Sequence, residues 1–313
     1  MRAKLFFTIL LTTFSTFIVS AQAKKSAASS SAQTARTITI ITEPSATVWL
    51  DEVKYGATND SGKLTLRNVS AGVRRLRVRA SGFKEIAQNL TAAQKGDVKI
   101  ALSKTADEAE LAFQQAEIEA GKNREKAVEL YRRAIALRPK YAEANLGLAR
   151  VLFAQGDTEN ALKAIQSARA ARPAYAEASA VEGRIYQVED KEEQAIASFK
   201  RSIAEGKNYQ PEARAGLGLL YKDKAEGFGA AGDFESERQN YKLAAAELDR
   251  AAAQLGTAPD AITIYQILGD CYERAKMYPE AIKTYEKFLR LFPDSDEAEA
   301  VRSFIVQINK REQ

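Results

Sequence analysis

Three arginines at every second position are the clearest candidates for binding chemistry in this sequence. Arg75, Arg77 and Arg79 alternate with apolar residues. Successive side chains of a β-strand point to opposite faces, so the three guanidinium groups would share one face. Guanidinium groups bind phosphates and carboxylates through paired hydrogen bonds, which makes this face a candidate surface for an anionic ligand. In the alternative, the face is solvated and carboxylates on neighbouring strands balance its charge.

The residue sets that most enzymes use for catalysis are missing from this sequence. It contains no histidine, which is the most frequent general base and transition-metal ligand. No nucleophile elbow, phosphate-binding loop or zinc-ligand spacing occurs either. Cys271, the sole cysteine, falls at an apolar helix position, which indicates a core residue. We therefore expect a protein that is not an enzyme and that uses neither a metal nor a cofactor.

The arginine face belongs to a region of alternating apolar and polar residues. The runs TITIIT, ATVWLD, KLTLRN, VRRLRVRA and DVKIAL follow one another between Thr37 and Leu102. Residues that favour turns, mainly Gly, Pro, Asn, Asp and Ser, separate these runs. Short strands at such regular spacing predict a small antiparallel β-sandwich over residues 37–103.

Part of this region resembles a PEGA domain. The stretch TEPSATVWLDEVKYGATNDSGKLTLRNVSAGVRRLRVRASGFKE, which starts at Thr42, has the proline, the strand ending in Asp51 and the closing Ala-Ser-Gly-Phe. It departs from the name-giving motif at Ser45, which stands in the glycine position. PEGA modules occur in exported and envelope proteins of bacteria. The resemblance therefore implies attachment to a surface or a glycan.

From residue 105 onward the sequence repeats itself with a period of 34 residues. The phrase YRRAIALRPKYAEA, which begins at Tyr131, returns as IQSARAARPAYAEA from Ile165. Ala127, Ala161 and Ala195 have the same spacing. Small residues at fixed positions indicate places where helices cross closely. A single helix pair of this length cannot bury its apolar face alone, so repeated pairs stack into a solenoid.

This pattern resembles the tetratricopeptide repeat (TPR). The resemblance implies five helix pairs over residues 105–294 and a capping helix over residues 295–313. The first pair departs from the pattern at Gln115, where later pairs have a small residue. The fourth pair has fourteen additional residues, around 227–240, that either lengthen its helices or form a loop. The predicted fold is thus multidomain, with a small all-β sandwich followed by an all-α TPR superhelical solenoid.

The TPR resemblance also implies a groove lined by the first helix of each pair. Arg150 and Arg184 occupy the same position in adjacent pairs, so we expect them side by side on the groove wall. The expected partner-binding residues are Arg150, Arg184, Glu143, Glu177, Phe153 and Lys222. Such a mixture of charged and aromatic residues is typical of peptide grooves. In the alternative, the acids and arginines of the wall pair with one another and bind no ligand.

The start of the chain has the order of a secretory signal peptide. A basic start is followed by an apolar run that ends at Val19 and by small residues up to Ala23. The run is shorter than the roughly 20 residues of a membrane span. We expect residues 1–23 to be cleaved, with retention as a membrane anchor as the alternative, and residues 24–36 to form a flexible linker. No later run is long enough to span a membrane.

These features favour an exported, periplasmic or envelope-associated scaffold that binds a protein or peptide in its TPR groove. The alternative is a structural anchor whose β-domain attaches to cell-wall glycan or to an anionic envelope polymer. Residues 36–103 carry eleven Lys and Arg against six Asp and Glu, which suits such a polymer. Nucleic acid would suit this charge as well, but it is excluded by the expected export.

Overall fold

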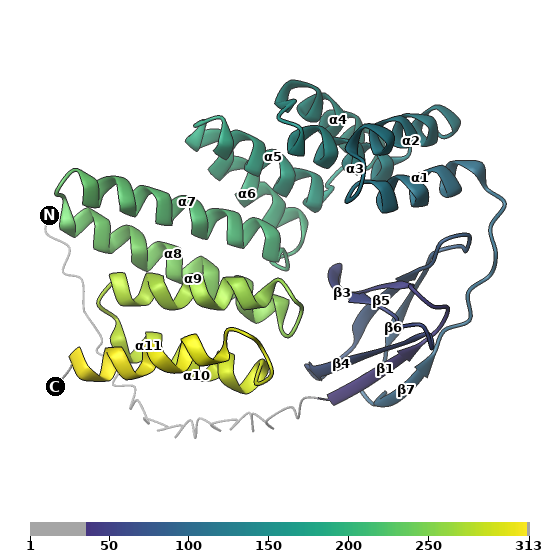
Figure 1. Cartoon of the computed structure of the whole chain (residues 1–313). Coiled ribbons are helices and arrows are strands. Elements are labelled where there is room, and N and C mark those ends of the chain that lie inside the picture. Colours follow the sequence, from purple (N-terminus) through teal and green to yellow (C-terminus); the bar gives the residue numbers. More distant parts are fainter. Residues whose placement is uncertain (1–35, 312–313) are drawn as a thin grey trace, which may run out of the picture. The chain divides into compact units, whose positions relative to one another are not determined.

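The computed structural model describes residues 36–311 (Figure 1). The predicted signal peptide, residues 1–23, lies outside the described residues, and so does the predicted linker except for Arg36. Among residues 36–311, no helix is both long enough and apolar enough to cross a membrane.

Seven strands form two sheets in the described part of the N-terminal region, which we call the β-domain (residues 36–104). One sheet has the order β4-β1-β7 and the other has the order β3-β2-β5-β6. The strands are β1 (Arg36–Ile41), β2 (Thr47–Leu50), β3 (Val53–Ala57), β4 (Lys63–Val69), β5 (Arg74–Arg79), β6 (Ile86–Leu90) and β7 (Gly96–Lys99).

Both sheets bury their apolar residues in one core. Ile38 and Ile40 of β1 are fully buried together with Val48 of β2 and Val78 of β5. Every second residue of these strands enters the core, which is the reason for the alternation in the sequence.

Our prediction of an antiparallel arrangement is wrong for one pair of strands. β1 pairs with β7 in parallel, from Ile38 opposite Gly96 to Ile41 opposite Lys99. Alternation predicts which face of a strand is buried, but it carries no information about the direction of the neighbouring strand.

The rest of the described chain is helical (Figure 1). Consecutive helices pack as the pairs α1 with α2, α3 with α4, α5 with α6, α7 with α8 and α9 with α10, and α11 packs on α10. The helices are α1 (Glu108–Glu119), α2 (Arg124–Leu137), α3 (Ala142–Ala154), α4 (Thr158–Ala171), α5 (Ala176–Val188), α6 (Glu192–Glu205), α7 (Pro211–Ala230), α8 (Phe234–Leu255), α9 (Ala261–Arg274), α10 (Tyr278–Leu291) and α11 (Ala298–Arg311).

Polar side chains define where several of these helices begin. Asp107, Asn123, Asp157 and Asp233 precede α1, α2, α4 and α8, and each accepts a hydrogen bond from a backbone N–H of the first turn. Such caps satisfy donors that have no partner within the helix.

The fourth pair resolves the choice between a loop and longer helices. α7 and α8 have 20 and 22 residues, whereas the helices of the second pair have 13 and 14. Only three residues, Ala231 to Asp233, separate α7 from α8. The additional residues near 227–240 therefore extend both helices.

Glycine and aromatic residues meet where the helices cross. A Cβ on Gly147 would lie 2.4 Å from the ring of Tyr131, and Gly183 and Gly216 leave the same kind of space for Phe199. All three glycines are on the first helix of a pair and both rings are on a second helix. At these crossings a small residue thus lies opposite a large one.

Candidate functional site

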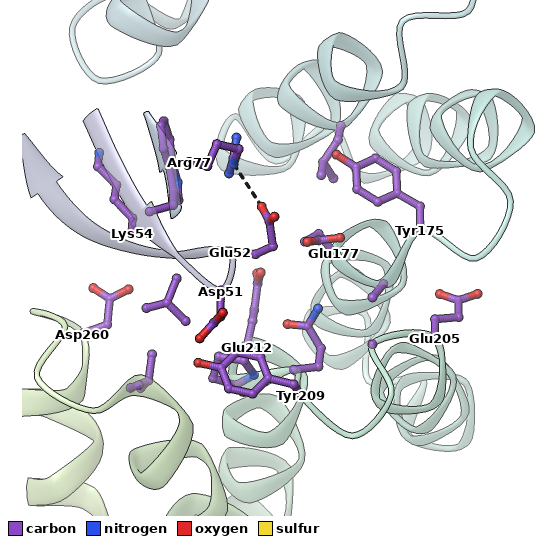
Figure 2. A pocket seen from close by; sticks show the side chains of 18 of the residues that line it. Asp51, Glu52, Lys54, Arg77, Tyr175, Glu177, Glu205, Tyr209, Glu212 and Asp260 are labelled. Atoms are coloured by element: carbon purple, nitrogen blue, oxygen red, sulfur yellow. Dashed lines mark ion pairs between the residues drawn. The ribbon is translucent and has the colours of Figure 1, made fainter. Parts of the chain in front are cut away.

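The described residues enclose a cavity of about 1610 Å³. Its walls come from the β-domain, mainly the turn after β2 and strand β5, and from helices α3, α5 and α7 (Figure 2). Pockets for drug-sized ligands usually measure roughly 300–1,000 Å³. This cavity is therefore large enough for a segment of polypeptide.

Four of the six predicted groove residues line this cavity, namely Glu143, Arg150, Glu177 and Arg184. Phe153 and Lys222 are not among the lining residues. Phe153 is half-buried, with the Arg184 guanidinium 5.8 Å from its ring centroid. Lys222 forms an ion pair with Glu226 one turn further along α7.

Arg150 and Arg184 share a single carboxylate. Arg150 Nη2 lies 3.2 Å from one oxygen of Glu212, and Arg184 Nη1 lies 3.4 Å from the other. Both arginine side chains are about half exposed, at 48% and 53%. In the alternative that we considered, these arginines pair with Glu143 and Glu177, but Glu143 pairs instead with Arg172. Two guanidinium groups on one carboxylate leave donors available for a second anion.

Glu177 has a different environment. It is half-buried, and Figure 2 shows it facing Glu52 of the β-domain across the cavity. Among the described residues, no Lys or Arg forms an ion pair with it. Burial raises the pKa of the Glu177 carboxyl, and repulsion from the Glu52 carboxylate raises it further.

The three arginines of the β5 face differ in exposure. Arg75 is 62% exposed, whereas the side chains of Arg77 and Arg79 are only 17% and 11% exposed. Arg77 pairs with Glu52 and Glu85, and Arg79 pairs with Glu85. For Arg77 and Arg79, carboxylates thus balance the charge, as in the alternative that we considered.

The ring of Trp49 packs against two of these arginines. The guanidinium of Arg77 lies 4.1 Å from the centroid of the Trp49 ring, and that of Arg79 lies 5.2 Å from it. Arg79 also lies 4.6 Å from the ring of Phe113 in α1 and 3.6 Å from the carboxylate of Glu117. These contacts to α1 depend on tertiary structure, so nothing in the local sequence indicated them.

A buried amide of the first helix also contacts the β-domain. Gln114 of α1 is 3% exposed, and its Oε1 accepts a hydrogen bond of 2.9 Å from Gly82 N. Its Nε2 donates to Phe83 O at 2.8 Å. An amide that is buried and bonded on both sides fixes the turn before β6 against α1.

A second set of contacts joins the β-domain to the end of α8. Thr257 Oγ1 donates to Arg67 O at 2.7 Å, and Tyr55 OH donates to Leu255 O at 3.2 Å. Val53, 6% exposed, belongs to the apolar cluster of the last helices. These residues could not be identified from the sequence, because single polar contacts between domains have no periodic pattern.

The lone cysteine lies away from these contacts. Cys271 is fully buried in α9, and burial raises the pKa of its thiol to about 12. A protonated thiol without access to solvent is unreactive, which agrees with its interpretation as a core residue.

Comparison with known proteins identifies two parts of the helical region. Residues 117–185 and residues 264–295 match family models of the tetratricopeptide repeat. The helices in these two ranges are tetratricopeptide repeats. TPR proteins generally mediate interactions between proteins. The comparison with curated protein sequences gave no match.

Several solved structures resemble this chain at low sequence identity. The chain is 13% identical to yeast Tom70, with a TM-score of 0.52, and the likeness covers 66% of this chain and 41% of Tom70. A TPR protein of Thermus thermophilus is 20% identical, with a TM-score of 0.44, and the likeness covers 64% of this chain and 98% of that protein. MamA is 19% identical, with a TM-score of 0.40, and the likeness covers 62% of this chain and 96% of MamA. The likeness to Tom70 shows that the TPR helices follow a known arrangement.

Proposed function

We propose that this protein is a non-enzymatic scaffold of the bacterial cell envelope that holds a segment of a partner protein in the cavity beside its TPR helices. Export through the N-terminal signal and the PEGA-like character of the β-domain are parts of this proposal. The observation that carries it is the pair Arg150 and Arg184 on the cavity wall. Each is half exposed, and within residues 36–311 the ion pairs of both arginines end on the one carboxylate of Glu212.

A partner carboxylate would complete this arrangement. Arginines on adjacent helices are held at a fixed separation, so little side-chain freedom remains to be lost when a ligand binds. A carboxylate can accept two parallel hydrogen bonds from one guanidinium. Loss of one charge-assisted hydrogen bond of this kind costs on the order of 1–3 kcal/mol. We infer that the bound segment presents an acidic side chain or a C-terminal carboxylate to Arg150 and Arg184.

The test is crosslinking of the full-length protein in cells, followed by identification of the captured proteins. The double variant Arg150→Ala/Arg184→Ala should lose the main captured partner and keep the melting temperature of the parent to within a few degrees. Arg133→Ala is the matched control, because Arg133 is 64% exposed on α2 and does not line the cavity. A partner captured equally by the double variant would remove the arginine pair from the binding site.

A structural anchor is the second candidate, and the exposure of Arg75 favours it. Arg75 is the most exposed of the three β5 arginines, and its contact with Glu52 is long, at 3.6 Å. It is therefore the β5 arginine with the most surface free to contact a large polymer. Sedimentation of the mature protein with purified cell wall, lost in Arg75→Glu and restored by Arg75→Lys, would support the anchor.

A further inference from the structure

The β-domain and the groove residues of the TPR helices line the same cavity from opposite sides. We propose that the β-domain is a lid docked on the groove, which admits extended polypeptide to Arg150 and Arg184 but excludes folded partners until the lid undocks. This inference rests on the proposed function, because it concerns access to the same cavity.

The first support is the position of the docking contacts. One contact, through Gln114, joins the β-domain to α1 of the first repeat. The other joins it to Leu255 and Thr257, at the end of the fourth repeat. Helices α3, α5 and α7, which carry the cavity wall, lie between these two points in the sequence of repeats. The β-domain is thus held on both sides of the arginine pair.

The second support is the turn between β2 and β3, which lies on the side of the β-domain that faces the helices. Asp51 and Glu52 both have positive φ, at 49° and 65°, a backbone conformation that is uncommon for residues other than glycine. Figure 2 shows both carboxylates on the side of the turn that faces the TPR helices. Arg74 pairs with Asp51 and lies 6.0 Å from the ring centroid of Tyr209, just before α7. The turn therefore occupies space in which a bulky partner would have to lie.

The third support is the character of the contact surface, which suits reversible docking. Most of the hydrogen bonds across it end on backbone carbonyls, at Phe83, Arg67 and Leu255, and water can replace such partners when the surfaces separate. Glu52 also faces Glu177, and two like charges at a contact favour separation. Val53 is the clearest apolar anchor, because it is 6% exposed and belongs to the cluster of the last helices.

Access to the groove can be measured without knowledge of the partner. Glu177→Cys places a thiol on the cavity wall, and its rate of reaction is measured with a small maleimide and with a bulky PEG-maleimide. The native Cys271 is fully buried and does not compete. Glu159→Cys is the reference, because Glu159 is 80% exposed on α4 and lies outside the cavity. Val53→Asp is the undocking variant, and Val188→Asp, at a position 67% exposed, is its control.

With the lid docked for about nine-tenths of the time, the bulky reagent should label Glu177→Cys about tenfold more slowly than it labels Glu159→Cys. The small reagent should show a much smaller difference. Val53→Asp should remove most of the protection against the bulky reagent, and Val188→Asp should leave it unchanged. If Val53→Asp does not fold, the milder pair Tyr55→Ala/Thr257→Ala removes the two hydrogen bonds at the end of α8 and takes its place.

Equal protection against both reagents in the parent protein would overturn the lid, and so would protection that no undocking variant relieves. Failure of the proposed function would look different. If Arg150 and Arg184 bind no partner, crosslinking is unaffected by their loss, while the labelling rates still report whether the β-domain covers the groove.

Discussion

A Cβ on Gly269 would lie 2.1 Å from Cε1 of Tyr285. The ring of Tyr285 therefore fits at this position because Gly269 has no side chain. Gly269 is on α9 and Tyr285 is fully packed on α10, where its hydroxyl donates to Glu273 at 2.8 Å. The same relation, with Gly183 and Phe199, occurs in the third repeat. This contact holds the two helices of a repeat together and depends on the smallest residue.

We predict that Gly269→Ala destabilises the protein by about 1–3 kcal/mol, because the methyl group must displace an aromatic ring in a close-packed seam. Gly227→Ala is the matched control. Gly227 is also helical, but a Cβ there would meet no atom within 4 Å, so alanine should stabilise α7 by up to about 1 kcal/mol. Thermal unfolding followed by circular dichroism measures both. A neutral Gly269→Ala would show that Tyr285 can move without cost.

Ala161→Phe should cost about 1–3 kcal/mol or more through overpacking. Ala161 is fully buried in α4, at the position that the 34-residue repeat assigns to the closest helix crossing. Ala170→Phe provides the comparison, because Ala170 is exposed on the same helix. Its melting temperature should stay near that of the parent. Equal melting temperatures for the two variants would contradict the assigned phase of the repeats.

The TPR helices could be predicted from the sequence because stacking repeats the same contacts every 34 residues. Ala161 and Gly183 belong to series of small residues, and each series is visible without a structure. The cavity wall was predictable for the same reason, as Arg150 and Arg184 show. The signal peptide, the PEGA-like identity of the β-domain and the cellular location stay predictions.

Contacts between the β-domain and the helices could not be predicted in this way. Gln114 is a single buried amide, and its partners Gly82 and Phe83 are backbone groups of a distant turn. The covering of Arg77 and Arg79 likewise depends on how two domains meet. Period-two alternation placed these side chains on one face of β5, and it could not show that other elements cover that face.

Substitutions of Arg77 and Arg75 should differ in their effect on stability, although we expected both side chains to point outward. Arg77→Ala removes two ion pairs and the contact with Trp49, so we expect a loss of about 1–2 kcal/mol. Arg75→Ala should cost less than about 0.5 kcal/mol, as is usual for exposed charges. Trp49 is the sole tryptophan of the chain, so its fluorescence reports this site directly. Arg77→Ala should shift Trp49 emission to longer wavelength, and Arg75→Ala should not. The opposite order would mean that Arg77 does not cover Trp49.

The raised pKa of Glu177 predicts how stability depends on pH. Below the ordinary glutamate pKa of 4.5, this carboxyl is protonated in both the folded and the unfolded chain. As the pH rises from there to the raised pKa, the unfolded chain releases the proton while the folded protein still holds it. Glu177 therefore reduces stability progressively across this window, and the reduction persists at higher pH.

Glu177→Gln should accordingly raise the melting temperature near neutral pH and leave it nearly unchanged at about pH 4, where the parent carboxyl is also neutral. Glu52→Gln should give no comparable gain, because it relieves the repulsion on Glu177 but also removes the ion pairs of Glu52 with Arg75 and Arg77. Glu159→Gln is the control, since Glu159 is 80% exposed and pairs with Lys163; its removal should give no gain at any pH. Melting curves recorded between these two pH values test the prediction. A gain for Glu177→Gln that is equally large at both would show that it does not come from the charge of Glu177.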